Sequence, residues 1–171
     1  LSMAGATLPE PIPNPTPVPK YTLPTGKLIY IPDELQSNDF TKEESQWSYY
    51  RMDYSDNFIV FWEKGFGSNP FTVTDQALRV DIKDLLEKAE LFYDVNVNKL
   101  KFVETGKSNT DKYRMMIFLK YQSEWLATGS GYDDIIGALW VNPSTCQPVG
   151  STIAHEVGHS FQYQTYCDNP T

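Results

Sequence analysis

The chain contains two histidines, and both belong to the short sequence His155-Glu156-Val157-Gly158-His159. Positions four residues apart lie about one turn apart on one face of a helix, so the two imidazoles could hold one tetrahedral cation, most often Zn2+. Glu156 is offset from that face, where its carboxylate can touch a water molecule bound to the ion. The ion would lower the pKa of this water, while Glu156 accepts the proton and later delivers it to the leaving amine. These residue types at this spacing predict metal-dependent hydrolysis.

The sequence around the motif predicts a helix over residues 151–166 with two distinct faces. The apolar face is expected to pack on the core and carries Ile153, Ala154, Val157 and Phe161. The opposite face carries His155, His159, Gln162, Tyr163 and Tyr166, with Glu156 at its margin. Gly158 would cost up to about 1 kcal/mol relative to Ala, so we expect a backbone or the sheet to approach it closely.

Most of these side chains also have a plain structural interpretation. Gln162 could orient a ligand histidine or face solvent, and Tyr163 and Tyr166 could stabilise an oxyanion or pack at a surface. Asp133 and Asp134 lack the spacing of a Ca2+ loop, so an exposed turn is the default for them. For the motif itself, the alternative is a structural helix with two surface histidines and no metal.

The elements that must position this helix predict an α+β fold with a mixed sheet. We expect strands over residues 26–32, 57–63, 99–104, 112–120 and 137–141, and an amphipathic helix over 76–94. The strand at 57–63 is expected to be central, whereas the strand at 137–141, closed by Asn142-Pro143, is expected at an edge. A short helix or an ordered loop is predicted over 37–50, and a polar, glycine-bearing loop over 127–137.

Composition limits the classes of partner. The net charge of −8 disfavours nucleic acid and anionic membranes, which are held by Lys and Arg. No apolar run is long enough to form a transmembrane segment. Prolines at alternate positions from Pro9 to Pro19 predict a Pro-rich linker over residues 1–20, ahead of a folded domain over 21–171. No signal peptide is present, yet a stiff stalk before an acidic domain favours a secreted or cell-surface attached protein.

Cys146 and Cys167 are not expected to pair with each other. A helix over 151–166 is about 22 Å long, whereas the five residues back to Cys146 reach at most about 17 Å, and a disulfide needs Cα atoms within about 7 Å. We therefore expect free thiols, or a partner outside this chain.

The motif, placed after a strand and inside an amphipathic helix, resembles that of the zincin metallopeptidases. The resemblance implies that His155 and His159 bind Zn2+, that Glu156 is catalytic, and that the domain is a zincin N-terminal subdomain. In that family an edge strand binds extended substrate, and here residues Gly137, Ala138 and Leu139 would do so. The stretches "DNFIVFWEKGFG", "ATGSGYDD", "ALWVNPSTCQPVG" and "HEVGHSFQYQ" are also similar to an uncharacterised family of secreted proteins from gut bacteria of the Bacteroides type, over residues 40–168.

The sequence has no third metal ligand at the positions that the known zincin subclasses use. A metzincin would have Gly at position 162 and His at 165, where this chain has Gln162 and Thr165, so that subclass is excluded. Gluzincins use a later Glu, and none follows Glu156. Asp168 is the carboxylate left as a candidate, although its surroundings do not match the aspzincin pattern. The missing third ligand is better explained if the domain lacks the C-terminal subdomain of a zincin than if Asp168 is the ligand. Such a fragment would bind metal weakly and be inactive.

The sequence therefore predicts zinc-dependent hydrolysis of peptide bonds in an extracellular protein or glycoprotein. The alternative is a non-catalytic module with a degenerate zincin fold that binds glycan or peptide through its aromatic surface.

Overall fold

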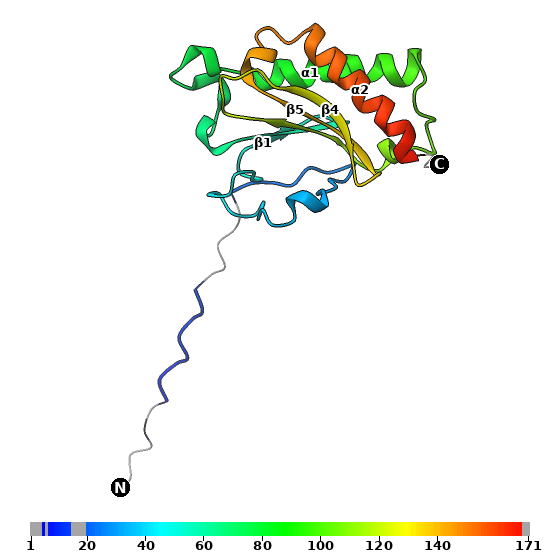
Figure 1. The fold of residues 1–171 in the computed structure, drawn as a ribbon. Helices are drawn as coiled ribbons and strands as arrows, with labels where there is room; N and C mark the ends of the chain where they lie inside the picture. Colours follow the sequence, from blue (N-terminus) through cyan, green and yellow to red (C-terminus); the bar gives the residue numbers. More distant parts are fainter. Residues whose placement is uncertain (1–4, 6, 15–19, 169–171) are drawn as a thin grey trace.

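A mixed five-stranded sheet forms the centre of the fold, with helices on one face and residues 20–50 across the other (Figure 1). The computed structural model describes residues 5, 7–14 and 20–168. Along the sheet the strands lie in the order β1 (Met52–Tyr54), β2 (Phe58–Trp62), β3 (Met115–Leu119), β5 (Ile136–Val141) and β4 (Ala127–Tyr132). The helices are α1 (Ile82–Asp94) and α2 (Ser151–Asp168). The predicted α+β class with a mixed sheet is confirmed.

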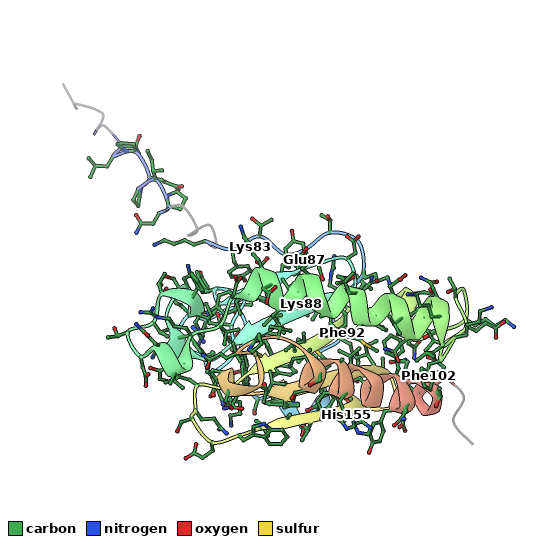
Figure 2. The ribbon with its side chains drawn as sticks, turned by 90° about the horizontal axis from the view of Figure 1, so that it is seen from above. Lys83, Glu87, Lys88, Phe92, Phe102 and His155 are labelled. Atoms are coloured by element: carbon green, nitrogen blue, oxygen red, sulfur yellow. The ribbon has the colours of Figure 1, made fainter. Side chains whose placement is uncertain are left out.

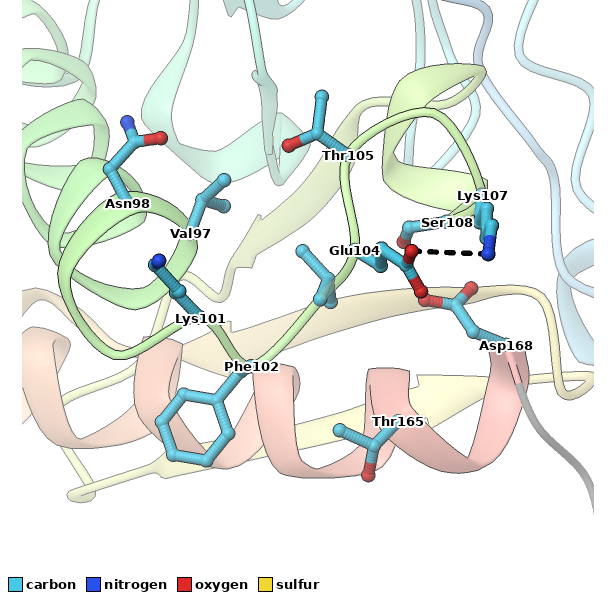
Figure 3. A pocket seen from close by; sticks show the side chains of 11 residues that line it. Val97, Asn98, Lys101, Phe102, Glu104, Thr105, Lys107, Ser108, Thr165 and Asp168 are labelled. Atoms are coloured by element: carbon cyan, nitrogen blue, oxygen red, sulfur yellow. Dashed lines mark ion pairs between the residues drawn. The ribbon is translucent and has the colours of Figure 1, made fainter.

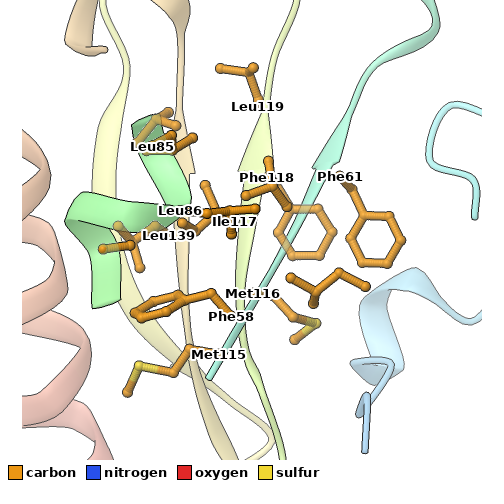
Figure 4. Close-up of a cluster of buried hydrophobic side chains, with 14 of the residues drawn as sticks. Phe58, Phe61, Leu85, Leu86, Met115, Met116, Ile117, Phe118, Leu119 and Leu139 are labelled. Atoms are coloured by element: carbon orange, nitrogen blue, oxygen red, sulfur yellow. The ribbon is translucent and has the colours of Figure 1, made fainter. Parts of the chain in front are cut away.

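Strands β2 and β3 form the buried middle of the sheet. They pair in parallel, with Phe58 opposite Met115, and every residue of both strands is buried. A strand covered on both faces is apolar throughout rather than alternating, which is why these runs were recognisable. Leu85 and Leu86 of α1 pack onto this layer (Figure 4). The predicted strands at 57–63 and 112–120 are confirmed, with each end shorter by one to three residues.

Helix α1 begins six residues later than the predicted start at 76. Asp81 is the N-cap, and its side chain accepts a hydrogen bond from the backbone N–H of Asp84 at 3.1 Å. Residues Gln76–Leu78 instead form a separate 3-10 turn, which is capped by Asp75. Caps of this kind satisfy N–H groups that have no partner inside a helix, so each aspartate fixes a new start.

Two predicted strands are wrong. Residues 99–104 form no strand, because α1 continues into a π-helical turn, Val95–Lys99, which is followed by Lys101 in a left-handed conformation (φ 52°). Residues 26–32 contribute a single bridge, from Leu28 to Tyr113, rather than a strand. Residues 37–50 contain no helix and form an ordered loop.

The predicted loop at 127–137 is largely strand β4, which forms a hairpin with β5. Gly129 and Gly131 of β4 lie against α2, where a Cβ on Gly129 would stand 2.2 Å from the carbonyl oxygen of Glu156. Because β4 occupies the edge, the expectation that Gly137, Ala138 and Leu139 form an edge strand is wrong. Ala138 and Leu139 have partners in both β3 and β4, and Gly137 is paired with Gly131.

The remaining predictions concern the terminus, the membrane and the cysteines. Residues 1–4, 6 and 15–19 of the predicted linker lie outside the described residues, while 5 and 7–14 are exposed and form no helix or strand. Within the described ranges, no helix combines the length and apolarity that crossing a bilayer requires. Cys146 and Cys167 do not pair with each other, as predicted, and both thiols are buried.

Candidate metal centre

Helix α2 lies along β4 and β5 and presents His155 on the side away from α1 (Figure 2). Ile153, Val157 and Phe161 are fully buried, as predicted, whereas Ala154 is only partly buried. Between helix and sheet, the Ser160 hydroxyl donates to the carbonyl oxygen of Ala138 at 3.2 Å. The buried face of α2 is thus attached to the sheet, and the opposite face is available for a functional site.

The two histidine rings converge through the same kind of nitrogen. Nε2 of His155 and Nε2 of His159 are 2.8 Å apart, and the ring centroids are 4.3 Å apart with the planes at 88°. Nδ1 of His159 lies 3.0 Å from Oε1 of Gln162. An amide oxygen only accepts, so Nδ1 of the neutral His159 ring carries the proton, and Nε2 of His159 accepts a hydrogen bond from the Nε2–H of His155. Gln162 thus contacts His159 and is also exposed to solvent, and its role in orienting a metal ligand stays a prediction.

This pair fits the demands of a divalent cation. Zn–N bonds of about 2.0–2.1 Å at a tetrahedral angle place two nitrogens about 3.3 Å apart. The separation of 2.8 Å is close to this value, so a small rotation of the exposed His155 ring meets the requirement. A hydrogen bond on the far ring nitrogen is also what fixes histidine ligands in metal sites.

Glu156 is more deeply placed than the histidines, since its side chain is 7% exposed. No fully buried side-chain oxygen among the described residues lacks a hydrogen-bond partner. The carboxylate of Glu156, which accepts no hydrogen bond from those residues, therefore keeps contact with solvent. An acid next to a ligand position with its oxygens free is able to accept a proton from water.

The structure places Asp168 away from the histidines, so its assignment as third ligand is wrong. It follows His159 by nine positions, about 13 Å along the helix axis. Its Oδ1 accepts hydrogen bonds from the backbone N–H of Asn109 at 2.9 Å and from Nε2 of Gln164 at 3.0 Å. It lines a separate cavity of about 620 Å³, with Thr165 and the ion-paired Glu104 and Lys107 (Figure 3). In the described part of the chain, no three His, Cys, Asp or Glu side chains converge.

The open edge of the sheet runs beside the histidine side of α2. A Cβ on Gly129 would meet Glu156, and one on Gly131 would meet Tyr163, so β4 runs in the same direction as the helix. The backbone N–H of Asn142 donates to the carbonyl oxygen of Leu126. Because β4 and β5 are antiparallel, every second residue of β4 forms hydrogen bonds with β5, and these are the even-numbered residues. The backbone groups of Ala127, Gly129 and Gly131 consequently point outward along the free edge.

A cavity of about 680 Å³ opens next to His159, lined also by Asp134, Gln162 and Tyr163. Sequence reasoning assigned Asp134 to an exposed turn, and it does occupy the β4–β5 turn, with Asp133 and Asp134 at φ 51° and 54°. Asp134 lies beside the motif because β4 and β5 form a hairpin. The sequence did not indicate this hairpin, because the glycines of β4 favoured the prediction of a loop. The side chain of Tyr166 lies outside the described part of the structure.

The expected close neighbour of Gly158 is absent, because no atom lies within 4 Å of the position its Cβ would take. The sheet approaches α2 on the side of Ser160 instead. The conformational cost of this glycine is therefore not explained by packing within the described residues.

Comparison with protein families gives a match over residues 22–171 to the family of unknown function DUF6055. The chain belongs to this family. The match covers the sheet, both helices and the histidine pair, so these features lie within the family domain. Its description carries no activity, and the zincin resemblance stays a prediction. Comparisons with curated proteins and with solved structures found no match.

Proposed function

We propose that this domain is a zincin-like metallopeptidase domain that hydrolyses peptide bonds of an extracellular protein or glycoprotein with the help of Zn2+. The observation that supports this most directly is the convergence of the Nε2 atoms of His155 and His159 at 2.8 Å, with Gln162 on the far nitrogen of one ring. The same two atoms are within hydrogen-bond distance of each other, so a bound cation would take the place of the shared proton. A third protein ligand would come from outside the described residues.

In this proposal the metal, when bound, acidifies a water molecule and polarises the scissile carbonyl. His155 and His159 hold the ion, and Gln162 keeps the proton of His159 on Nδ1 so that Nε2 stays available. Glu156, which is next to the pair and has no hydrogen-bond donor, accepts the proton of the attacking water and returns it to the leaving amine.

The substrate strand would add to β4 rather than to β5. The outward N–H and C=O groups of Ala127, Gly129 and Gly131 run alongside the histidine side of α2. An extended peptide that pairs with this edge would pass the metal in a defined register, since backbone hydrogen bonds fix its direction. The absence of side chains at Gly129 and Gly131 also lets the helix stay close to that edge.

The test measures metal content and hydrolysis separately. The full chain is loaded with Zn2+, and cleavage of a casein or mucin-type glycoprotein substrate is followed by mass spectrometry. Glu156→Gln is expected to keep the bound metal and to lose cleavage by at least 100-fold, as for a general base. Glu87→Gln, an exposed change on α1, is the control (Figure 2). Full activity of the Glu156 variant would remove this residue from the mechanism.

A second candidate, a non-catalytic glycan-binding module, is favoured by a groove on the opposite face of the sheet. This groove of about 410 Å³ includes Trp140, Tyr132, Thr128 and Lys120. Trp140 is stacked on Phe118 at 4.4 Å, and its indole N–H donates to the Tyr132 hydroxyl, so a rigid aromatic ring lies beside polar groups. Saturable glycan binding that chelators leave unchanged, and that Lys120→Ala weakens, would favour this candidate.

A further inference from the structure

The cavity beside His159 combines one carboxylate with one aromatic ring. We propose that it is a subsite for a lysine or arginine side chain of the substrate, an inference that rests on the proposed hydrolysis and names the class of peptide that is cut. The cavity has a volume of about 680 Å³ and is formed by the tip of the β4–β5 hairpin and the outer side of α2. Asp134, Gln162 and Tyr163 surround it next to the metal ligand.

Asp134 supplies a negative charge that nothing else in the described chain neutralises. Its neighbour Asp133 is already engaged, because Oδ2 of Asp133 accepts hydrogen bonds from the Tyr30 hydroxyl at 2.9 Å and from the backbone N–H of Asp33 at 2.7 Å. No described residue forms an ion pair with Asp134, since the two ion pairs lie elsewhere. A carboxylate at a cavity wall with free lone pairs attracts a cationic group that can donate to it.

Tyr163 supplies the complementary surface. Its side chain is 50% exposed, so the ring is presented to the cavity rather than to the core. An ammonium or guanidinium group is attracted to the face of an aromatic ring as well as to a carboxylate, whereas an acidic side chain is repelled by both. Gln162 cannot compete for the ligand, because its oxygen accepts from His159.

The location suits a side chain of a peptide that is bound along β4. Gly131 of the free edge lies against Tyr163, and the hairpin turn that carries Asp134 follows directly after β4. A peptide strand on this edge therefore brings one of its side chains to the cavity as it passes His159. The net charge of −8 adds a long-range field that draws basic peptides toward the domain.

The experiment measures binding apart from cleavage. The peptides Ac-AAKAA-NH2, Ac-AAEAA-NH2 and the norleucine analogue are titrated into the full chain carrying Glu156→Gln, with Zn2+ and with a chelator. Backbone amide shifts in NMR spectra give both the affinity and the residues affected. We expect the lysine peptide to bind at least threefold more tightly than the norleucine peptide and to shift the amides of Gly131 and Tyr163.

Three variants separate the contributions to this subsite. Asparagine tolerates the left-handed backbone conformation of residue 134. Asp134→Asn should lower the affinity for the lysine peptide about three- to fivefold and leave the affinity for the norleucine peptide unchanged. Tyr163→Phe should retain the preference, and Tyr163→Leu should reduce it about two- to fivefold. Asp56→Asn removes the same charge from the β1–β2 turn at the other edge of the sheet and should change nothing.

The outcomes distinguish this inference from the proposed hydrolysis. Equal affinity for the three peptides, or an unchanged preference in Asp134→Asn, overturns the basic subsite even if the wild-type chain cleaves proteins. A preference that depends on Asp134 supports the subsite even if no cleavage occurs, in which case only the hydrolysis is abandoned. In an active chain, mapped cleavage sites should carry a basic residue at one constant position.

Discussion

Arg51 and Arg114 show how single buried side chains hold the loops of this domain. Arg51 is 5% exposed, and its guanidinium donates to the carbonyl oxygens of Glu43, Ser45, Gln46 and Trp62. Arg114 is 3% exposed and donates to Thr25, Lys27 and Ser55. Burial lowers the pKa of both guanidinium groups, yet arginine keeps its charge. Each residue therefore replaces water for several carbonyl groups in segments without regular structure.

Arg51→Ala is expected to destabilise the fold by about 3 kcal/mol, because four carbonyl groups lose their donor and a cavity remains. Arg51→Lys should be intermediate, since one ammonium cannot match the planar fork of a guanidinium. Urea unfolding followed by tryptophan fluorescence measures both. Lys83→Ala on the exposed side of α1 is the control, and an Arg51→Ala midpoint equal to that control would contradict the assignment (Figure 2).

The two thiols should react slowly in the folded protein. Burial raises the pKa of the Cys146 thiol to about 11, and burial, together with the charges of Asp134 and Asp168, raises the pKa of Cys167 to about 11. Because the thiolate is the reactive form, alkylation at pH 8 should be slow until the chain unfolds. A rate equal to that of the unfolded chain would show that the thiols are accessible.

The same shift predicts a loss of stability in alkali. The folded pKa of Cys146 lies above the value of 9.0 for an unperturbed thiol, so the unfolded chain loses its proton first as the pH rises. The stabilisation is complete below about pH 9 and is lost between pH 9 and 11, on the order of 2 kcal/mol for this thiol. Unfolding midpoints across this range, with Cys146→Ser as the comparison, measure it.

The residues of the proposed metal site could be selected from the sequence because they are close neighbours along one helix. A spacing of four places His155 and His159 together on any helix, and Gln162 follows one turn after the central glycine. Asp168 was wrongly assigned as a ligand because its distance from His159 depends on where α2 ends. The helix continues to Asp168, so this residue lies at the opposite end of α2 from the start of the motif. Asp134 was missed as part of the site because its position depends on a hairpin rather than on its neighbours in the sequence.

At the scale of elements, glycines decide how closely α2 and β4 approach. Gly129 and Gly131 leave room for the helix backbone and for Tyr163, and Gly137 leaves room for Ser160. These contacts place the histidines next to the open edge of the sheet. A glycine inside a strand often marks such a close approach of another backbone.

Gly129→Ala is expected to destabilise the domain by about 2–4 kcal/mol and to lower Zn2+ affinity, because the added Cβ would stand 2.2 Å from the Glu156 carbonyl oxygen. Gly158→Ala, on α2, is the matched variant, because its Cβ would meet no atom within 4 Å. It should stabilise the helix by about 0.5–1 kcal/mol. Thermal unfolding compares the two, and effects of the same sign would contradict this packing.

Element prediction succeeded where apolar pattern and burial agreed. The runs at 58–62 and 115–119 and the helix at 151–168 were found because each buries a continuous surface. It failed where side chains acted at a distance or as caps. Asp81 moved the start of α1, a π-helical turn replaced the strand at 99–104, and the glycines of β4 looked like a loop although α2 requires them.

For the whole molecule, metal binding and folding should be linked. A cation that binds the folded pair, and binds the unfolded chain less, stabilises the fold by about 1.4 kcal/mol for each tenfold excess over its dissociation constant. Zn2+ should therefore raise the unfolding temperature, and a chelator should reverse the rise. His155→Ala should abolish the effect without changing the metal-free protein, because His155 is exposed. An equal rise in this variant would place the metal elsewhere.

The order of the strands was beyond sequence reasoning, because it depends on pairings between distant segments. The sequence indicated a mixed sheet, but β5 could equally have ended it, since the Asn142-Pro143 pair that follows is typical of an edge. The hairpin places β4 outside β5 instead. Edge position matters here, since it determines which backbone groups remain free to bind another chain.

The parallel pairing of β2 with β3 also has a kinetic consequence. Phe58 and Met115 are partners although 57 positions separate them, and β3 must then accept β5 on its other side. Bringing two distant strands together costs chain entropy before the contacts between them form. Domains of this kind therefore refold more slowly than helical bundles of equal size. The half-formed sheet would expose the apolar run of β3 during that interval, and dilute, cool conditions should therefore give the highest yield of refolded protein.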